Sequence, residues 1–295
     1  MVSAPLHSFI LYILLVCGAL SAFASPLPLL ELESRANGVD QSTYSDMERY
    51  AKYSSATYQL ICPKPLGNKL VTKFDVGGTT GFVARDDGRK EIVVAFRGTA
   101  DLSDIITDAG ISLKSMLLTG VTCPSQVAVH SGFQVGYKNV ESSVLNTVKS
   151  QLVTYPTYRV VVTGHSLGGA LASLSAISLK SGIPNANLKL FTYGQPRAGN
   201  GAFASLVESL IGTPNIFRSV HTFDGVPTFF LDKLGYKHFA SEFWQFQEPA
   251  NAGNIKICAG GEDPKCSDSI PSTFINVAHL SYFGQVMAIN PFLCF

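Results

Sequence analysis

The stretch Gly164-His165-Ser166-Leu167-Gly168-Gly169 constrains the fold more than any other part of this 295-residue chain. It follows the β-branched run 159–163, whose lack of alternation predicts a central strand covered on both faces. An Ala-, Leu- and Ser-rich segment follows and predicts a helix over 166–181. Glycines two residues before and after a serine permit a sharp turn that exposes the hydroxyl above a sheet. We therefore predict that Ser166 is a nucleophile at a strand–turn–helix junction.

Such a turn could also be an ordinary glycine-rich connection or a phosphate loop. The phosphate-loop pattern is missing, because no Gly-Lys-Ser/Thr follows, and there is no Gly-x-Gly-x-x-Gly fingerprint. A nucleophile turn would place the N–H of Leu167 and the positive end of the helix dipole near the reacting oxygen of a substrate. Leu167 is thus expected to donate to an oxyanion.

A serine nucleophile needs a base, which in this arrangement follows the serine and the acid in the chain. Only three histidines lie downstream of Ser166: His221, His238 and His279. His221 ends a predicted strand and precedes every candidate acid loop, which favours a structural role. His238 comes so soon after Asp224 that little chain separates the two. We therefore favour His279 as the base.

Several aspartates could orient that base. Asp224 comes just after the predicted strand 216–221, and loops at the carboxyl ends of parallel strands gather at one edge of a sheet. Asp232, Asp263 and Asp268 are the alternatives, with the pattern of solvated loop carboxylates. We predict Asp224 as the acid.

Strand and helix patterns alternate along the chain, which predicts an α/β fold with a mostly parallel central sheet flanked by helices. No repeat or low-complexity tract interrupts the alternation, so a single domain is expected. Ser42 or Ser45 is the expected cap of the first helix. The predicted strands are 70–76, 81–85, 91–96, 159–163, 188–193 and 216–221, and the predicted helices are 42–60, 135–152, 166–181 and 202–211.

The N-terminal 24 residues contain no Lys, Arg, Asp or Glu and hold one apolar block that ends in small residues. This pattern predicts a secretory signal peptide over 1–24, since the block is shorter than the ~20 apolar residues that span a bilayer. Residues 25–40 are predicted to be a propeptide or flexible arm, and 41–295 the catalytic domain. The protein is expected to be secreted and extracellular.

Secretion would place the cysteines in an oxidising compartment, where disulfides are expected. Cys258 and Cys266 flank a turn-rich span that can close a local bridge. A bridge between Cys62 and Cys294, near the two ends, would constrain the unfolded chain most. One thiol of the mature chain must remain unpaired, and Cys123 is the candidate.

Charge and motif content exclude other classes of function. The net charge is +1, and Lys and Arg are scattered singly, which argues against nucleic-acid binding. No Cys-x-x-Cys and no His-Glu-x-x-His occurs, so no metal is expected. An organic cofactor is not expected either.

Together these motifs resemble the class 3 lipase family of the α/β-hydrolases, over roughly residues 44–294. The resemblance rests on the order of Phe96-Arg97-Gly98-Thr99, His130-Ser131-Gly132-Phe133, the extended turn 163–172, Tyr193-Gly194-Gln195-Pro196-Arg197, Asp224-Gly225-Val226-Pro227 and Ala278-His279-Leu280. It implies Ser166, Asp224 and His279 as a catalytic triad. It also implies that Thr99 shares an oxyanion hole with Leu167.

The resemblance has two further consequences. The cysteine pattern of the family supports the pairs Cys62–Cys294 and Cys258–Cys266. Two positions depart from the family, which usually has a polar residue where this chain has Phe223 and often has an aspartate where it has Asn276.

The segment after Thr99 contains Leu102, Ile105 and Ile106 at helical spacing, which predicts one apolar face. An ordinary surface helix would give the same spacing. Its position beside the oxyanion residue favours an interfacial lid that covers the site when closed and meets lipid when open.

The combined prediction is a secreted serine carboxylic ester hydrolase that acts on triacylglycerols or other lipid esters at a lipid–water interface, as a monomer. A feruloyl esterase-like hydrolase of aromatic esters is the alternative on the same scaffold. A catalytically silent binding protein is a further alternative, because fold does not fix function.

Overall fold

The computed structural model describes residues 38–99, 112–272 and 275–295. The predicted signal peptide, most of the predicted arm and the predicted lid residues Leu102, Ile105 and Ile106 lie outside these ranges. Within the ranges, no helix has the length and apolar content needed to cross a membrane.

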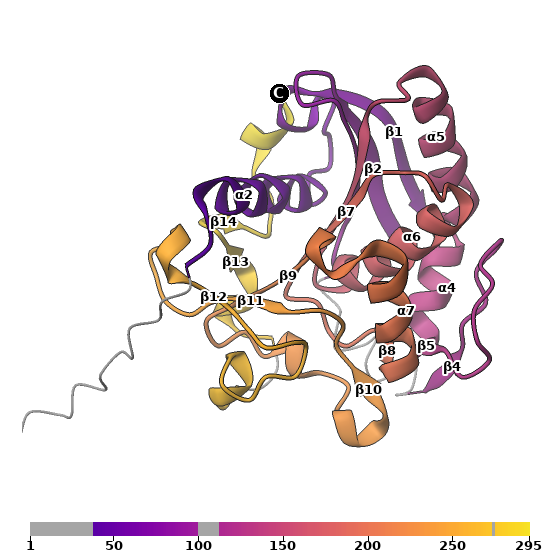
Figure 1. The fold of residues 1–295 in the computed structure, drawn as a ribbon. Helices are drawn as coiled ribbons and strands as arrows, with labels where there is room; N and C mark the ends of the chain where they lie inside the picture. Colours follow the sequence, from indigo (N-terminus) through magenta and orange to yellow (C-terminus); the bar gives the residue numbers. More distant parts are fainter. Residues whose placement is uncertain (1–37, 100–111, 273–274) are drawn as a thin grey trace, which may run out of the picture. The chain divides into compact units, whose positions relative to one another are not determined.

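An eight-stranded sheet organises residues 38–295, in the order β1-β2-β3-β6-β7-β9-β11-β12 (Figure 1). Neighbours from β3 to β11 pair in parallel, whereas β1, β2 and β12 are antiparallel additions at the two edges. The strands are β1 (Lys69–Val76), β2 (Thr79–Asp86), β3 (Glu91–Phe96), β6 (Arg159–His165), β7 (Leu188–Tyr193), β9 (Ile216–His221), β11 (Glu242–Gln245) and β12 (Ile255–Ile257). The predicted mostly parallel α/β fold is confirmed.

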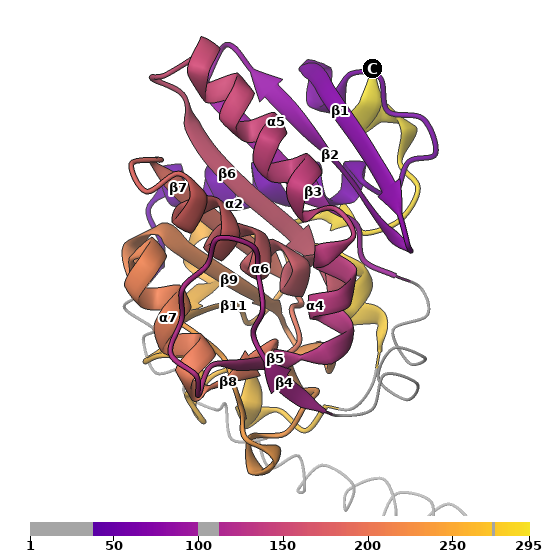
Figure 2. The same cartoon turned by 90° about the vertical axis from the view of Figure 1, so that its right-hand side faces the viewer.

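Helices cover both faces of this sheet (Figures 1 and 2). One face carries α4 (Ser131–Lys138), α5 (Glu141–Thr154), α6 (Leu167–Gly182) and α7 (Gly201–Ile211), and the other carries α2 (Gln41–Ala56). Along β6 the side chains alternate between two apolar clusters: Val160 and Val162 pack on the α6 side, and Val161 packs on the α2 side. Burial on both faces explains why this strand shows no polar alternation in sequence.

Shorter elements complete the chain. Four short strands form a second sheet in the order β10-β8-β5-β4, and β13 pairs with β14. Their bounds are β4 (Leu113–Ser115), β5 (Ala128–His130), β8 (Gly199–Asn200), β10 (Tyr236–Lys237), β13 (Ser281–Tyr282) and β14 (Gln285–Val286). Single 3₁₀ turns are η1 (Pro65–Gly67), η2 (Thr213–Asn215), η3 (Val226–Thr228), η4 (Asp232–Leu234), η5 (Ala252–Asn254), η6 (Ser267–Ser269), η7 (Val277–Leu280) and η8 (Pro291–Cys294).

The predicted helix 135–152 is wrong as one helix, because the chain turns between α4 and α5 at Asn139 and Val140. The four-residue spacing of Val140, Val144, Val148 and Leu152, which favoured a helix here, belongs to α5 and its cap, where Val144 and Val148 are fully buried. Val135 lies on α4 and is 63% exposed. The prediction therefore extended the helix back across the turn into α4, beyond the residues that carry the spacing.

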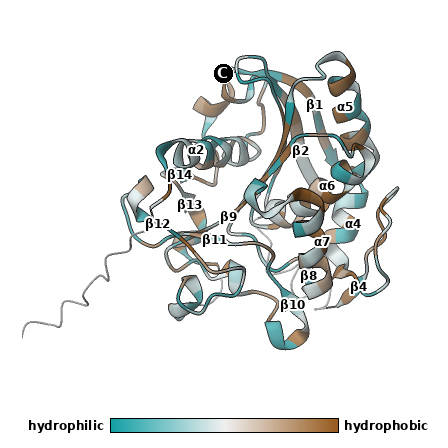
Figure 3. Ribbon diagram, viewed as in Figure 1, coloured by the Kyte–Doolittle hydropathy of each residue, from teal (hydrophilic) through white to brown (hydrophobic). Residues whose placement is uncertain are grey.

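The first helix also differs from its prediction. Its cap is Asp40, whose carboxylate accepts from the N–H groups of Ser42 and Thr43 at 2.9 Å each, so neither Ser42 nor Ser45 caps it. It ends at Ala56, short of the predicted residue 60. The ribbon of α2 is mostly white and teal in Figure 3, because many of its residues are polar, among them the exposed Ser42 and Ser45 and the buried Ser54 and Ser55.

Both expected disulfides are present. Cys62 is bonded to Cys294 across a sequence separation of 232, and Cys258 to Cys266 across a separation of 8. Cys123 is the free thiol among the described cysteines and is partly buried.

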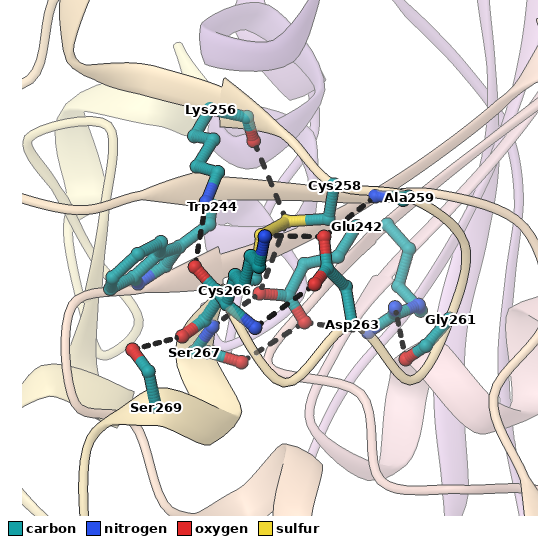
Figure 4. Close-up of a disulfide and its surroundings, with 12 residues drawn as sticks. Glu242, Trp244, Lys256, Cys258, Ala259, Gly261, Asp263, Cys266, Ser267 and Ser269 are labelled. Carbon is teal, nitrogen blue, oxygen red and sulfur yellow. Dashed lines mark hydrogen bonds and ion pairs between the residues drawn. A yellow bond between two sulfur atoms is a disulfide. The ribbon is translucent and has the colours of Figure 1, made fainter. Parts of the chain in front are cut away.

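The Cys258–Cys266 bridge lies against the buried carboxylate of Glu242, a residue of β11 (Figure 4). Glu242 accepts from the N–H and the hydroxyl of Ser267 at 3.1 and 3.0 Å, and it pairs with fully buried Arg218 at 3.4 Å. Burial raises the pKa of Glu242, while Arg218 opposes that rise. This ion pair joins β11 to β9, the strand that leads to Asp224.

Candidate active site

Ser166 lies between the end of β6 and the start of α6, as the sequence predicts, with a φ of +58°. Positive φ is costly for a residue with a side chain, so the surrounding backbone must hold it. The N–H of Ser166 donates to the carbonyl of Tyr193 at 2.8 Å, which ties the turn to the neighbouring strand β7. The Ser166 Oγ is buried and neither donates nor accepts a hydrogen bond among the described residues.

The glycines around Ser166 leave no room for side chains. A Cβ on Gly164 would lie 2.1 Å from the carbonyl oxygen of Gly168, and a Cβ on Gly168 would lie 2.3 Å from that of Phe96. Both contacts involve backbone atoms, which cannot give way as a side chain could. Glycine at these two positions therefore allows β3, β6 and α6 to meet closely at the turn.

His279 and Asp224 meet beside this turn, although 55 residues separate them in sequence. The Nδ1 of His279 lies 2.8 Å from Oδ2 of Asp224, and both side chains are almost completely buried. An ionised carboxylate can only accept, so Nδ1 carries the proton and Nε2 is left as an acceptor. This is the tautomer that a general base requires.

Two other groups hold the carboxylate of Asp224. Oδ1 accepts from the N–H of Val226 at 2.9 Å, and the hydroxyl of Tyr282 donates to Oδ2. Burial and the adjacent Asp224 raise the pKa of Tyr282 well above its usual value, so the phenol stays protonated and donates. Three donors, from Val226, Tyr282 and His279, therefore satisfy this buried carboxylate.

Gly194, at the end of β7, makes room for this cluster. Its φ is +57°, and a Cβ there would lie 2.6 Å from Oδ2 of Asp224 and 2.9 Å from Nδ1 of His279. A side chain at this position would therefore push the acid and the histidine apart.

Two histidines fix the backbone of the turn η7 that carries His279. The Nε2–H of His165 donates to the carbonyl of His279 at 2.8 Å, and the Nδ1–H of His221 donates to that of Ala278 at 2.8 Å. The other nitrogen of His165 accepts from the hydroxyl of Tyr58 at 2.7 Å, so this ring is neutral. Burial lowers the pKa of His165 well below its usual value, and the nearby His279 lowers it further.

The two predicted oxyanion residues flank Ser166. Leu167 is the first residue of α6, so its N–H has no partner within the helix. Thr99 follows Gly98, where a Cβ would lie 3.0 Å from the Cβ of Ser166. The loop after β3 therefore passes directly beside the serine.

A cavity of about 540 Å³ opens at this point. Thr99, His165 and His279 form part of its wall. The apolar side of the wall includes Ile275, Leu280, Met287 and Ile289. The site thus joins an acid–base pair to a mainly hydrophobic cavity.

Glu242, Cys258 and Cys266 form the single group of described residues with spacing suited to a metal ion. Both sulfurs are bonded to each other, which leaves one carboxylate, and a disulfide offers no thiolate ligand.

Sequence reasoning missed three contributors to the site. Tyr282 has a faint signal, since it follows His279 by three residues in a Leu-Ser-Tyr-Phe-Gly run. Gly194 lies in a motif used only for the resemblance. Tyr58 carries no local signal, because its partner His165 is 107 residues away.

The sheet order and the strand–turn–helix junction define an α/β-hydrolase. Residues 93–234 match the class 3 lipases. Over 284 residues the chain is 32% identical to a secreted alkaline triacylglycerol lipase of Penicillium cyclopium, covering 95% of each chain. The chain belongs to the class 3 lipase family.

Solved structures of triacylglycerol lipases resemble the fold of this chain. A triacylglycerol lipase of Penicillium expansum superposes with a TM-score of 0.79 at 29% identity, covering 85% of this chain and 97% of that one. Another triacylglycerol lipase, whose catalytic centre is described as a serine protease triad, superposes with a TM-score of 0.74 at 30% identity, covering 88% and 99%.

Proposed function

We propose that this chain is a secreted serine carboxylic ester hydrolase that cleaves triacylglycerols or other lipid esters through an acyl-enzyme on Ser166. The observation that carries the proposal is the buried 2.8 Å contact between His279 and Asp224 beside the strained serine turn. The relatives, which are named as triacylglycerol lipases, support the same activity.

In the first stage Ser166 attacks the ester carbonyl while Nε2 of His279 takes the hydroxyl proton. Asp224 holds the ring in its tautomer and stabilises the imidazolium. The same proton then passes to the leaving alcohol, so the acyl group remains on Ser166. In the second stage His279 takes a proton from water while the water oxygen attacks the acyl carbon. His279 then gives that proton to Ser166 Oγ as the bond to the acyl group breaks, and the fatty acid is released.

The tetrahedral intermediate places negative charge on the former carbonyl oxygen. The N–H groups of Thr99 and Leu167 are proposed to donate to it, and each such donor contributes about 3 kcal/mol in comparable sites. The hydroxyl of Thr99 is a further donor for the same oxygen.

The apolar wall of the cavity supports an aliphatic acyl group as the substrate part that binds there. Ile275, Leu280 and Ile289 would remove such a chain from water on binding. The helical spacing of Leu102, Ile105 and Ile106 in the sequence supports a lid that meets the lipid–water interface.

The remaining parts of the proposal concern processing and assembly. Residues 1–24 are proposed to be removed as a signal peptide, 25–40 to act as a propeptide or flexible arm, and 41–295 to form the catalytic domain. The enzyme would then be extracellular and act as a monomer. Relatives described as secreted support the extracellular location.

A comparison of two substrates tests the function. Hydrolysis rates are measured on an emulsified long-chain triacylglycerol and on methyl ferulate, with Ser166→Ala as the control for activity from elsewhere. We expect the emulsion to be preferred and the rate to jump above the solubility limit of the lipid. Preference for the aromatic ester would replace the lipase proposal with that of a feruloyl esterase. Absence of hydrolysis on both substrates would favour a binding protein.

A further inference from the structure

Asn276 links the two loops that carry the acid and the base. Its Nδ2 donates to the carbonyl of Phe223 at 2.8 Å, and Phe223 directly precedes Asp224. Its Oδ1 accepts from the N–H of Ala278 at 3.0 Å, which caps the turn η7 that carries His279. One amide side chain therefore contacts the residue before the acid and the residue before the base.

The contact with Phe223 fixes a peptide plane that belongs in part to Asp224. The carbonyl of Phe223 accepts from Asn276 and also from the hydroxyl of Ser272. On the other side of the same peptide, the N–H of Asp224 donates to the carbonyl of His221 at 2.9 Å. With both ends held, this peptide cannot rotate without breaking a hydrogen bond, so the backbone that places Asp224 is restrained.

The two loops are thus joined at two points. The inner point is the buried contact between His279 and Asp224, and the outer point is the exposed contact between Asn276 and Phe223. Two attachments between the same pair of loops fix their relative rotation, which a single hydrogen bond cannot do. Asparagine suits the outer point because its side chain both donates and accepts, whereas an ionised aspartate only accepts.

From these contacts we propose that Asn276 is a positioning residue for the triad, acting through the carbonyl of Phe223 on the orientation of Asp224. The inference rests on the proposed function, because it assumes that Asp224 orients His279. Asn276 touches no reacting atom. Its effect is expected in turnover and not in substrate binding, since the cavity wall stays in place.

Two substitutions separate this role from simple capping of η7. Asn276→Ala removes both contacts, whereas Asn276→Asp keeps the capping acceptor and loses the donor to Phe223. Aspartate caps as well as asparagine, so a residue needed only as a cap would tolerate Asn276→Asp. If the donor to Phe223 matters, both variants lose activity.

We expect kcat to fall roughly tenfold in both variants with KM within about twofold, because small misplacements of catalytic groups cost rate. Asn251→Asp is the matched control. Asn251 caps η5 in the same way and donates to the carbonyl of Pro249 at 3.0 Å, away from the triad. The Asn251→Asp variant should leave kcat unchanged.

The measurement is hydrolysis of a soluble short-chain ester, with kcat expressed per site titrated by a phosphonate ester so that misfolded protein does not count. Wild-type kcat in Asn276→Asp would overturn the proposal. If both Asn276 variants fail to fold, Ser272→Ala tests the same carbonyl: a few-fold lower kcat per titrated site supports the proposal, and unchanged kcat contradicts it. Full activity in Ser166→Ala would instead show that the proposed function itself is wrong.

Discussion

The nucleophile turn and the two loops facing it are built in different ways. Ser166 is held by backbone: a strand, a helix, two glycines without room for a Cβ and one hydrogen bond to Tyr193. Asp224 and His279 lie in short turns outside the main sheet. They are held by side chains, including Tyr282, His165 and His221.

This difference explains which parts tolerate change. A residue held by backbone atoms depends little on which side chains surround it, and its geometry survives as long as the adjoining strands and helix form. A residue held by side chains depends on distant partners, each of which can be replaced singly. The loops are therefore the part of the site where single substitutions should change rate in graded steps.

The largest expected effect is at the nucleophile turn, which is held by backbone atoms. Ser166→Ala should lower kcat for ester hydrolysis by on the order of 10⁶, because it removes the atom that forms the acyl-enzyme. The measurement is turnover of a soluble ester at saturating substrate, with the melting temperature as a control for folding. Activity within tenfold of the wild type would refute the assignment of the nucleophile.

On the side held by side chains, Asp224→Asn should lower kcat by roughly 10⁴, because the amide can donate to Nδ1 and favours the wrong histidine tautomer. Asp232→Asn is the matched control, since Asp232 is 56% exposed and pairs with Lys237. Its effect should be within twofold. A greater loss of kcat in Asp232→Asn than in Asp224→Asn would mean that Asp224 is not the acid of the triad.

The smallest expected effect is on stability and concerns two buried histidines. Burial lowers the pKa of His165 and of His238 well below the usual value. The folded protein thus binds fewer protons than the unfolded chain below about pH 6.5, the usual histidine pKa. The free energy of unfolding should be constant above that pH and fall below it, by up to about 1.4 kcal/mol per pH unit for each histidine.

Denaturant unfolding at pH 7.5, 6.5 and 5.5 measures this slope. Glu242 acts in the opposite direction, because burial raises its pKa, so His165→Gln and His238→Gln are needed to isolate the histidine contribution. Each variant should flatten the slope, because glutamine does not titrate. Slopes equal to that of the wild type in both variants would contradict the prediction.

The sequence predicted the elements that obey one local pattern. The strands around β6 and the turn at Ser166 follow from β-branched runs and glycine spacing. The break between α4 and α5 was missed, because neither of the two residues at the turn, Asn139 and Val140, is a glycine or a proline. The cap at Asp40 was missed in favour of two nearby serines.

For the site, chain order and a preceding strand were enough to propose Asp224 and His279. The supporting contacts could not be predicted, because Tyr58, His221 and Asn276 act on partners that only folding brings near. Each belongs to a residue type that occurs often without such a role. Long-range hydrogen bonds leave no periodic signal in a sequence.

The disulfide between Cys62 and Cys294 closes the chain between them, from β1 to η8, into one covalent loop. A protease that cuts once within this covalent loop leaves two fragments, which the disulfide still joins. Ser166, Asp224 and His279 all lie inside the loop, so a singly nicked molecule would still hold all three on one connected chain. This topology gives the molecule a tolerance to a single backbone cut that its hydrogen bonds alone would not provide.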